Sequence, residues 1–221
     1  MPVKKFQTVD GKKQNYLQEN NNIKIGVLAL QGAFREHIAS IRKCGFSAIE
    51  IRFPHQLDDI DGLIIPGGES TTIIKLVDKY DFKPALKKFH RKQKPVFGTC
   101  AGLILLAKKV AGYDFGLGFI DITVQRNAYG RQIDSFEQHV MFDYENSQNQ
   151  EEFKAVFIRA PKITAAGKNV QILSSLNGNT VLAKEENIMV CTFHPELTDD
   201  LRIHRLFIDM VKKSVNMVKS K

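Results

Sequence analysis

From Ile23 onward, runs of consecutive apolar residues alternate with segments in which apolar residues recur at helical spacing. Four of the apolar runs are typical of strands buried on both faces: "IKIGVLAL", "AIEIRF", "GLIIPGG" and "PVFG". Four other segments have the pattern of helices: "FREHIASIRKC", "STTIIKLVDKY", "KPALKKFHRK" and "AGLILLAKKV". Strands separated by helices favour a mostly parallel sheet, because parallel neighbours need a crossover connection between them.

The second half of the chain is richer in strand patterns and ends in an amphipathic segment. The predicted strands are "FIDITVQRN", "FKAVFIRAP", "VQILSSL", "TVLAKEEN" and "IMVCTFH", with "LNGNT" as a hairpin turn. The segment "DDLRIHRLFIDMVKK" places its apolar residues on one side of a helix. We therefore expect a single α/β domain: a three-layer, flavodoxin-like sandwich with a mostly parallel twisted sheet, helices on both faces and some antiparallel strands.

The two ends of the chain differ in composition from the part between them. Residues 1–22 are polar, rich in Asn, Gln and Lys, and without periodicity, which is typical of a disordered or loosely attached extension. We predict that the folded domain comprises residues 23–215 and that residues 216–221 form a basic C-terminal tail.

The formal net charge of +8 raises the question of nucleic-acid binding. Part of the basic excess lies near the two ends of the chain, at Lys4, Lys5, Lys12, Lys13, Lys212, Lys213, Lys219 and Lys221. The body of the chain has no basic stripe interleaved with aromatic residues. Solvated tails are therefore favoured over a nucleic-acid surface.

The apolar runs and the cysteines bear on the compartment in which the protein works. The longest apolar runs, "IGVLAL" and "GLILLA", are too short to span a bilayer, and the chain does not open on a signal-peptide pattern. The three cysteines form neither a disulfide framework nor a CxxC metal pair. We expect a reducing compartment, the cytoplasm, and no bound metal.

A cysteine lies between two glycines in "KPVFGTCAGLILLAKK", where a predicted strand turns directly into a predicted helix. This is the pattern of a nucleophile elbow, with Cys100 in the place of the usual serine. The helix N-terminus favours the thiolate of Cys100, and the amide of Ala101 would face a developing oxyanion. The alternative is a buried structural cysteine in a tight turn.

A thiol nucleophile needs a base, and one of the six histidines has a suitable place. His194 ends the apolar strand of "VCTFHPEL", and Glu196 follows two residues later, on the same side of an extended chain. His37, His90 and His204 fall on predicted amphipathic helices, where we expect them to be partly exposed. The alternative for the segment of His194 is an ordinary loop after a core strand.

Two other cysteines and a glycine pair complete the set of candidates. Cys191 lies inside an apolar strand and Cys44 at a helix end, so both are expected to be packing residues. In "LIIPGGESTT", Gly67 and Gly68 would let backbone amides turn toward an oxyanion, before a helix capped by Ser70 or Thr71. Taken alone, such a turn is an ordinary loop.

Three blocks together, "PGGEST", "FGTCAGL" and "FHPEL", resemble the class I (triad) glutamine amidotransferase domain. The segments "IGVLALQGAFREH", "QRNAYGRQIDSFE" and "VFIRAP" narrow the resemblance to the family of glutaminase subunits of pyridoxal 5′-phosphate synthase. The blocks occur in the family's order between Ile23 and Val215. Residues 1–22 fall outside the resemblance.

The resemblance implies hydrolysis of glutamine to glutamate and ammonia, with Cys100 as nucleophile, His194 as base and Glu196 as the orienting carboxylate. It implies contacts with glutamine at Gly68, Glu69, Ser70, Arg126, Ile158 and Arg159. Gln31 and Gly32 match a segment near the oxyanion loop and the partner interface. From charge alone, Arg126 or Arg159 would complement the α-carboxylate of glutamine and Glu69 its α-ammonium group.

The resemblance also implies a partner, because ammonia released into water would be wasted. That partner is a larger synthase subunit, which receives the ammonia, builds pyridoxal 5′-phosphate from ribose 5-phosphate and glyceraldehyde 3-phosphate, and activates the glutaminase. A rotated peptide between Gly67 and Gly68 is the expected switch. No cofactor is implied for this chain.

Three other readings remain open at the level of the sequence. A related PfpI-like cysteine hydrolase also places its cysteine on an α/β elbow. A non-catalytic scaffold or regulatory subunit would keep the fold without the chemistry. A nucleic-acid-binding protein is suggested by the net charge alone.

Overall fold

A seven-stranded sheet forms the centre of the molecule, with the strand order β10-β11-β12-β4-β3-β1-β2. The structure is a computed structural model and describes residues 23–126, 135–142 and 151–219. Five strands are mutually parallel: β1 (Lys24–Leu28), β2 (Ser47–Ile51), β3 (Gly62–Ile65), β4 (Val96–Thr99) and β12 (Ile188–Cys191). The antiparallel strands β10 (Gln171–Leu176) and β11 (Asn179–Glu185) extend the sheet beyond β12. The predicted mostly parallel sheet with added antiparallel strands is therefore confirmed.

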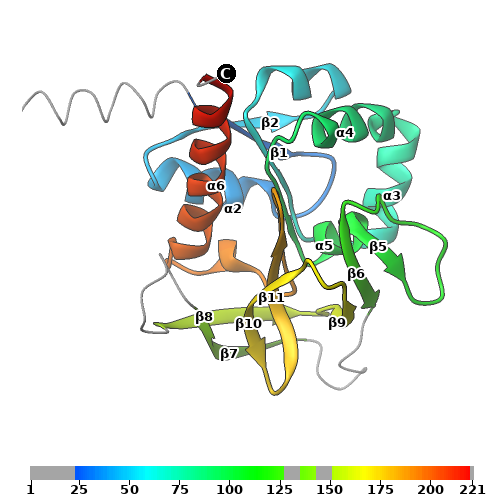
Figure 1. The fold of residues 1–221 in the computed structure, drawn as a ribbon, viewed down its shortest axis with the longest axis vertical. Coiled ribbons are helices and arrows are strands. Elements are labelled where there is room, and N and C mark those ends of the chain that lie inside the picture. The colour runs from blue at the N-terminus through cyan, green and yellow to red at the C-terminus, as the bar shows by residue number, and fades with distance from the viewer. Residues whose placement is uncertain (1–22, 127–134, 143–150, 220–221) are drawn as a thin grey trace, which may run out of the picture.

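Helices cover both faces of this sheet, as predicted, because its strands are apolar on both sides (Figure 1). Leu63 and Ile65 of β3 pack into one core, and Ile64 between them packs into the other. The first core lies under α3 (Ser70–Lys79), α4 (Phe82–Arg91) and α5 (Ala101–Leu106). The second lies under α2 (Phe34–Lys43) and α6 (Arg202–Lys219).

The segment predicted as the helix "AGLILLAKKV" is helical only in its first half. Helix α5 ends at Leu106, and β5 (Ala107–Val110) follows at once, so the prediction is wrong for the second half. Strand β5 pairs with β6 (Ile120–Gln125), which in turn pairs with β9 (Lys162–Ala166) in a three-stranded sheet. Pairing with strands distant in sequence overrides the helical propensity of Ala and Lys in this segment.

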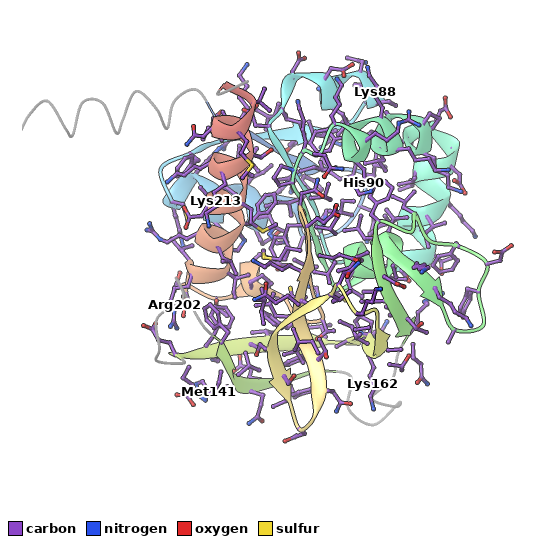
Figure 2. All side chains as sticks on the ribbon, viewed as in Figure 1. Lys88, His90, Met141, Lys162, Arg202 and Lys213 are labelled. Atoms are coloured by element: carbon purple, nitrogen blue, oxygen red, sulfur yellow. The ribbon has the colours of Figure 1, made fainter. Side chains whose placement is uncertain are left out.

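A two-stranded hairpin, β7 (Ser135–Phe142) with β8 (Glu151–Ile158), lies beside the start of α6 (Figures 1 and 2). Arg202 connects the two elements, because its guanidinium donates to the carboxylate of Glu151 at 2.6 Å and to the carbonyl of Glu152 at 2.6 Å. Asp200 accepts two further bonds from the same guanidinium at 3.0 Å. The start of β8 is thereby fixed relative to the loop that follows β12.

Two short 3-10 helices, η1 (Pro54–Asp59) and η2 (Pro195–Leu197), complete the elements. The predicted hairpin turn between β10 and β11 is confirmed, with φ of 49° at Asn177 and 74° at Gly178. Helix α6 continues through residues 216–219, which we had assigned to a tail. The predicted extension 1–22 lies outside the described residues, as does the part of "QRNAYGRQ" that follows Arg126. Within the described ranges, no helix has the length and apolar character needed to span a membrane.

Candidate active site

Cys100 occupies a strained turn between the end of β4 and the start of α5. Its φ of 46° and ψ of −98° lie outside the common regions for a residue with a side chain. A Cβ on Gly102 would lie 2.0 Å from the carbonyl oxygen of Ile65, and one on Gly98 would lie 2.7 Å from backbone of Gly102. The two glycines are therefore required for strand and helix to approach each other, as the elbow pattern predicts.

His194 and Glu196 face Cys100 from the segment that follows β12. The strand ends at Cys191 and Glu196 lies in η2, so the predicted extended chain from His194 to Glu196 is wrong, although the two side chains do meet. Nδ1 of His194 lies 2.8 Å from Oε1 of Glu196. The ring also adjoins the side chain of Cys100, since a Cβ built on Gly67 would lie 2.3 Å from Cε1 of His194 and 3.3 Å from Cβ of Cys100. Strand β12 is the neighbour of β4, with Cys191 in register with Thr99, so their carboxyl ends lie together. The amide of His194 donates to the carbonyl of Val156 at 2.8 Å, which ties the segment to β8.

The electrostatics of this group favour a charged imidazole. Burial disfavours the charge, but hydrogen bonds with Cys100 and Glu196 outweigh it and raise the pKa of His194 to about 10. Burial likewise opposes ionisation of Glu196, yet His37 and His194 beside it lower its pKa. A cationic ring next to the sulfur stabilises a thiolate, which is the reactive form of cysteine.

The two other cysteines are core residues, as predicted. Cys191 is fully buried, and its thiol donates to the carbonyl of Phe193 at 3.2 Å. Burial raises the pKa of Cys191 far above that of a free thiol, so this residue stays protonated. Cys44 is buried at the end of α2, and burial raises the pKa of its thiol as well. Only Cys100, among the three, adjoins an imidazole.

The Gly67–Gly68 loop is held by backbone contacts on two sides. The amide of Gly67 donates to the hydroxyl oxygen of Thr99 at 2.9 Å, and the carbonyl of Gly67 accepts from the amide of Ala33 at 3.1 Å. Since the C=O and N–H of a planar trans peptide point in opposite directions, the amide of Gly68 points away from Ala33. In this conformation the amide of Gly67, which we had predicted as an oxyanion donor, is already engaged by Thr99.

Gln31 and Gly32 lie directly against this loop. Oε1 of Gln31 accepts from the amide of Glu69 at 2.9 Å. Gly32 has a φ of +100°, and a Cβ there would lie 1.9 Å from the carbonyl oxygen of Gly67. The segment before α2 thus contacts the predicted oxyanion loop at two separate points.

Glu69 caps α3, so the prediction of Ser70 or Thr71 as the cap is wrong. Its carboxylate accepts from the amide of Thr71 at 3.0 Å and from the amide of Thr72 at 2.6 Å. The hydroxyl of Thr72 donates to the same carboxylate, and these bonds lower the pKa of Glu69 to about 2 despite some opposing burial. Glutamate is an uncommon cap, which is why the pattern favoured its neighbours.

Arg126 lies beside Glu69, with Nη2 at 3.6 Å from the carboxylate and 3.1 Å from the hydroxyl of Thr71. Its guanidinium also stacks over the ring of Tyr113, 4.7 Å from the ring centre. Arg126, one of the two arginines predicted for the α-carboxylate of glutamine, therefore adjoins Glu69, the residue predicted for its α-ammonium group, at the start of α3.

Of the remaining predicted site residues, Ile158 contacts Cys100 directly. The thiol of Cys100 lies 3.8 Å from the carbonyl oxygen of Ile158, at the end of β8. Arg159 follows in a left-handed conformation, with φ of 44°. Ser70 is buried as the first residue of α3, and Ala101 opens α5, where the first backbone amides have no partner within the helix.

Two histidines that we predicted to be partly exposed are fully buried instead, so that prediction is wrong. His37 contacts Thr99 at 3.2 Å and Glu196 at 3.3 Å through Nε2, while Nδ1 lies 3.0 Å from Nε2 of His204. The sequence contained an indication of this burial. His37 is three residues after Phe34 and His204 is three residues before Phe207, so each histidine lies on the apolar side of its helix. We gave more weight to the polarity of histidine than to its position.

These buried histidines predict a loss of stability in mild acid. Burial, with the neighbouring His37, lowers the pKa of His204 to about 3, and burial also lowers that of His37. The unfolded chain takes up protons on both rings as the pH falls through about 6.5, whereas the folded chain does not, so acid favours unfolding. We expect the free energy of unfolding in urea to fall by several kcal/mol between about pH 7 and pH 5.

The His204→Gln variant is the matched comparison for this prediction. It removes one of the two groups, so its stability should depend less steeply on pH in that window. The paired carboxylates act at lower pH, since their ordinary pKa values lie near about 4. Equal slopes in the wild type and His204→Gln would contradict the assignment.

Within the described parts of the chain, no three His, Cys, Asp or Glu side chains are grouped so as to hold a metal ion. What the site presents is a sulfur nucleophile, a charged imidazole, a buried carboxylate and backbone amides at a helix start. This set is suited to attack on a carbonyl carbon and to transfer of a proton to the leaving group.

Comparison with known proteins gives consistent matches over most of the chain. Residues 27–213 match the SNO glutamine amidotransferase family. The chain is 54% identical over 190 residues to pyridoxal 5′-phosphate synthase subunit PdxT of Bacillus licheniformis, covering 86% of this chain and 95% of the relative. It is 52% identical over 191 residues to the same subunit of Thermotoga petrophila, covering 86% and 100% of the two chains.

A solved structure described as a glutamine amidotransferase superposes on the fold with a TM-score of 0.79. It shares 41% of its sequence with this chain, and the match covers 85% of this chain and 98% of the other. The structure of PurLQS from Thermotoga maritima, 16% identical with a TM-score of 0.63 over 89% and 99% of the two chains, shares the fold.

Proposed function

The chain belongs to the SNO glutamine amidotransferase family, and we propose that Cys100, His194 and Glu196 carry out its reaction, the hydrolysis of L-glutamine to L-glutamate and ammonia. Its relatives are subunits of pyridoxal 5′-phosphate synthase, so the chain is the glutaminase subunit of that enzyme and acts in vitamin B6 biosynthesis. The observation that carries the catalytic assignment is the contact of the Cys100 thiol with an imidazole held by Glu196.

The first half of the reaction forms a thioester. The sulfur of Cys100 attacks the side-chain carboxamide carbon of glutamine, and the thiol proton resides on His194. The tetrahedral intermediate collapses as the C–N bond breaks, and His194 gives its proton to the leaving nitrogen, which departs as ammonia. Glu196 keeps the imidazole in place through the 2.8 Å contact with Nδ1.

The second half releases glutamate. A water molecule gives a proton to the now neutral His194 and attacks the thioester carbon, and the C–S bond breaks to regenerate Cys100. Both tetrahedral intermediates carry an oxyanion next to the start of α5. The amide of Ala101 and an amide of the Gly67–Gly68 loop are the proposed donors to it.

Recognition of the charged ends of glutamine is assigned to the start of α3. Arg126, whose side chain is 14% exposed, would pair with the α-carboxylate, and Glu69, at 53% exposed, with the α-ammonium group. The low pKa of Glu69, about 2, keeps it anionic for this role. Gly68, Ser70, Ile158 and Arg159 are proposed to line the remainder of the substrate site.

Gln31 and Gly32 are proposed to transmit binding of the other synthase subunit. They contact the loop at Glu69 and Gly67, so displacement of this segment would move the loop. The amide of Gly67 is engaged by Thr99, and a rotated Gly67–Gly68 peptide would redirect a donor toward the oxyanion. The assembly is a hetero-oligomer, and we place it in the cytoplasm, since the three cysteines are free.

Measurement of ammonia and glutamate released from glutamine, with and without the other synthase subunit, tests this function. We expect equal amounts of the two products and a rate at least about tenfold higher in the complex, because closure of the oxyanion site needs the partner. An electrophilic glutamine analogue should label Cys100. Hydrolysis of peptides without glutaminase activity would favour the PfpI-like alternative, and no turnover at all would favour a scaffold.

A further inference from the structure

A chain of buried polar side chains continues behind Glu196, away from the substrate. Oε2 of Glu196 lies 3.3 Å from Nε2 of His37, and both side chains are inaccessible to solvent. The same Nε2 lies 3.2 Å from the hydroxyl of Thr99, and Nδ1 of His37 lies 3.0 Å from Nε2 of His204. Three elements meet there: α2 carries His37, α6 carries His204, and Thr99 precedes the nucleophile.

The positions of the protons follow from what each atom can accept. An ionised carboxylate only accepts hydrogen bonds, so a nitrogen 3.3 Å from Oε2 of Glu196 must carry the proton for the contact to be attractive. That places the proton of a neutral His37 on Nε2, facing both Glu196 and Thr99. Its Nδ1 then accepts from Nε2–H of His204, which leaves Nδ1 of His204 as a bare acceptor without a partner among the described residues.

The same contacts reach the predicted oxyanion loop. The hydroxyl oxygen that faces His37 accepts the amide of Gly67 at 2.9 Å. His37 also lies one turn into the helix that follows Gln31 and Gly32, the segment that contacts the loop from its other side. His37 therefore lies directly beside the triad carboxylate. It is connected to the oxyanion loop through one residue, Thr99.

We propose that His37 is a positioning residue for the glutaminase reaction: its Nε2–H donates to the hydroxyl of Thr99 and faces Oε2 of Glu196 at 3.3 Å, and so sets the Gly67 amide and the triad carboxylate relative to each other. This inference rests on the proposed function, since it concerns the same triad. Glu196 has two oxygens, and His194 uses only Oε1. Oε2 accepts no hydrogen bond among the described residues, so the polar N–H of His37 that faces it favours this rotation of the carboxylate, and through it the plane of the imidazole.

Three variants of the chain in complex with the other synthase subunit test this role. His37→Leu fills the space without a donor, and His37→Gln places an amide N–H close to the position of Nε2. His90→Leu is the control, because His90 lies on α4 over the opposite face of the sheet and stacks on Phe119 (Figure 2). For each we would measure kcat and KM for glutamine, the pH profile of kcat/KM, and the melting temperature.

We expect His37→Leu to lower kcat about 10–100-fold with KM within about twofold of the wild-type value, as for other residues that orient a catalytic ligand. His37→Gln should recover most of the kcat, and His90→Leu should leave it unchanged. Because His37→Leu alters packing as well, its melting temperature is compared with that of His37→Gln. If the leucine variant does not fold, the kcat and pH profile of the glutamine variant decide.

The pH profile separates positioning from packing. Glu196 is faced by His37 from α2, His204 from α6, Cys191 from β12 and His194 from its own segment. His37 lowers the pKa of Glu196, so its loss should raise that pKa and move the acidic limb of kcat/KM to higher pH. A folded His37→Leu variant with wild-type kcat and pH profile would overturn the proposal.

Two further results would also count against it. Equal losses in His37→Leu and His37→Gln, each matched by a loss of melting temperature, would mean that the histidine only fills space. A wild-type pH profile in a folded His37→Gln variant of low activity would do the same. Absence of ammonia release by the wild-type complex itself would instead contradict the proposed function.

Discussion

Replacement of Cys100 by alanine is expected to lower glutamine-dependent ammonia release by the complex at least about 10⁴-fold, as loss of the nucleophile does in other triad enzymes. No other cysteine can substitute. Cys191 is fully buried and held protonated, and Cys44 is buried at the far end of α2. The measurement is glutamate formed from glutamine under single-turnover and steady-state conditions.

Two controls make this result specific to the chemistry. Cys44→Ala removes a cysteine of similar burial and should keep the wild-type rate. The Cys100→Ala complex, supplied with an ammonium salt in place of glutamine, should still form pyridoxal 5′-phosphate, because only the source of ammonia has been lost. Glutamine turnover within about tenfold of wild type in Cys100→Ala would show that the triad is idle.

Gly67→Ala is expected to lower kcat by about 10²–10³-fold while the protein stays folded, because displacement of catalytic groups by about 1 Å has costs of this order. A Cβ on Gly67 would lie 2.3 Å from Cε1 of His194 and 3.3 Å from Cβ of Cys100. The imidazole is hydrogen-bonded to Glu196 and adjoins Cys100, so it cannot give way without disturbing one of these two contacts.

Gly68→Ala is the matched variant one residue along. There the nearest atom is Oε1 of Gln31, at 2.4 Å, the end of a flexible side chain that can move. We expect the loss of kcat to be smaller, about tenfold, since Gly32 also lies close. Melting temperatures of both variants exclude global unfolding as the cause. A larger loss in Gly68→Ala than in Gly67→Ala would contradict the steric explanation.

The local pattern of the chain was sufficient for most elements of the fold. Buried strands such as Leu63 to Ile65 are apolar on both faces, and helices such as α2 repeat their apolar residues at helical spacing. The pattern failed after Leu106, where Ala107 and the residues after it pair with β6. An edge pairing of this kind depends on a partner strand that the local sequence does not reveal.

For the site, local sequence was informative where function depends on neighbours in the chain. The elbow at Cys100 needs Gly98 and Gly102, and Glu196 reaches His194 because the two are only two residues apart. The local sequence was misleading at the start of α3, which is capped by Glu69 and not by Ser70 or Thr71. The carboxylate of Glu69 accepts from two backbone amides at this helix end. General preferences for capping residues do not take such a specific geometry into account.

Local sequence was enough to predict the turn that carries Cys100 and the pairing of His194 with Glu196, because both depend on residues close together in the chain. The fold as a whole makes β4 and β12 neighbours, which brings Cys100 to His194. It also decided that His37 and His204, 167 residues apart, are buried together behind Glu196. Contacts of that separation depend on strand order and on which face each helix covers, and these are properties of the whole assembled core.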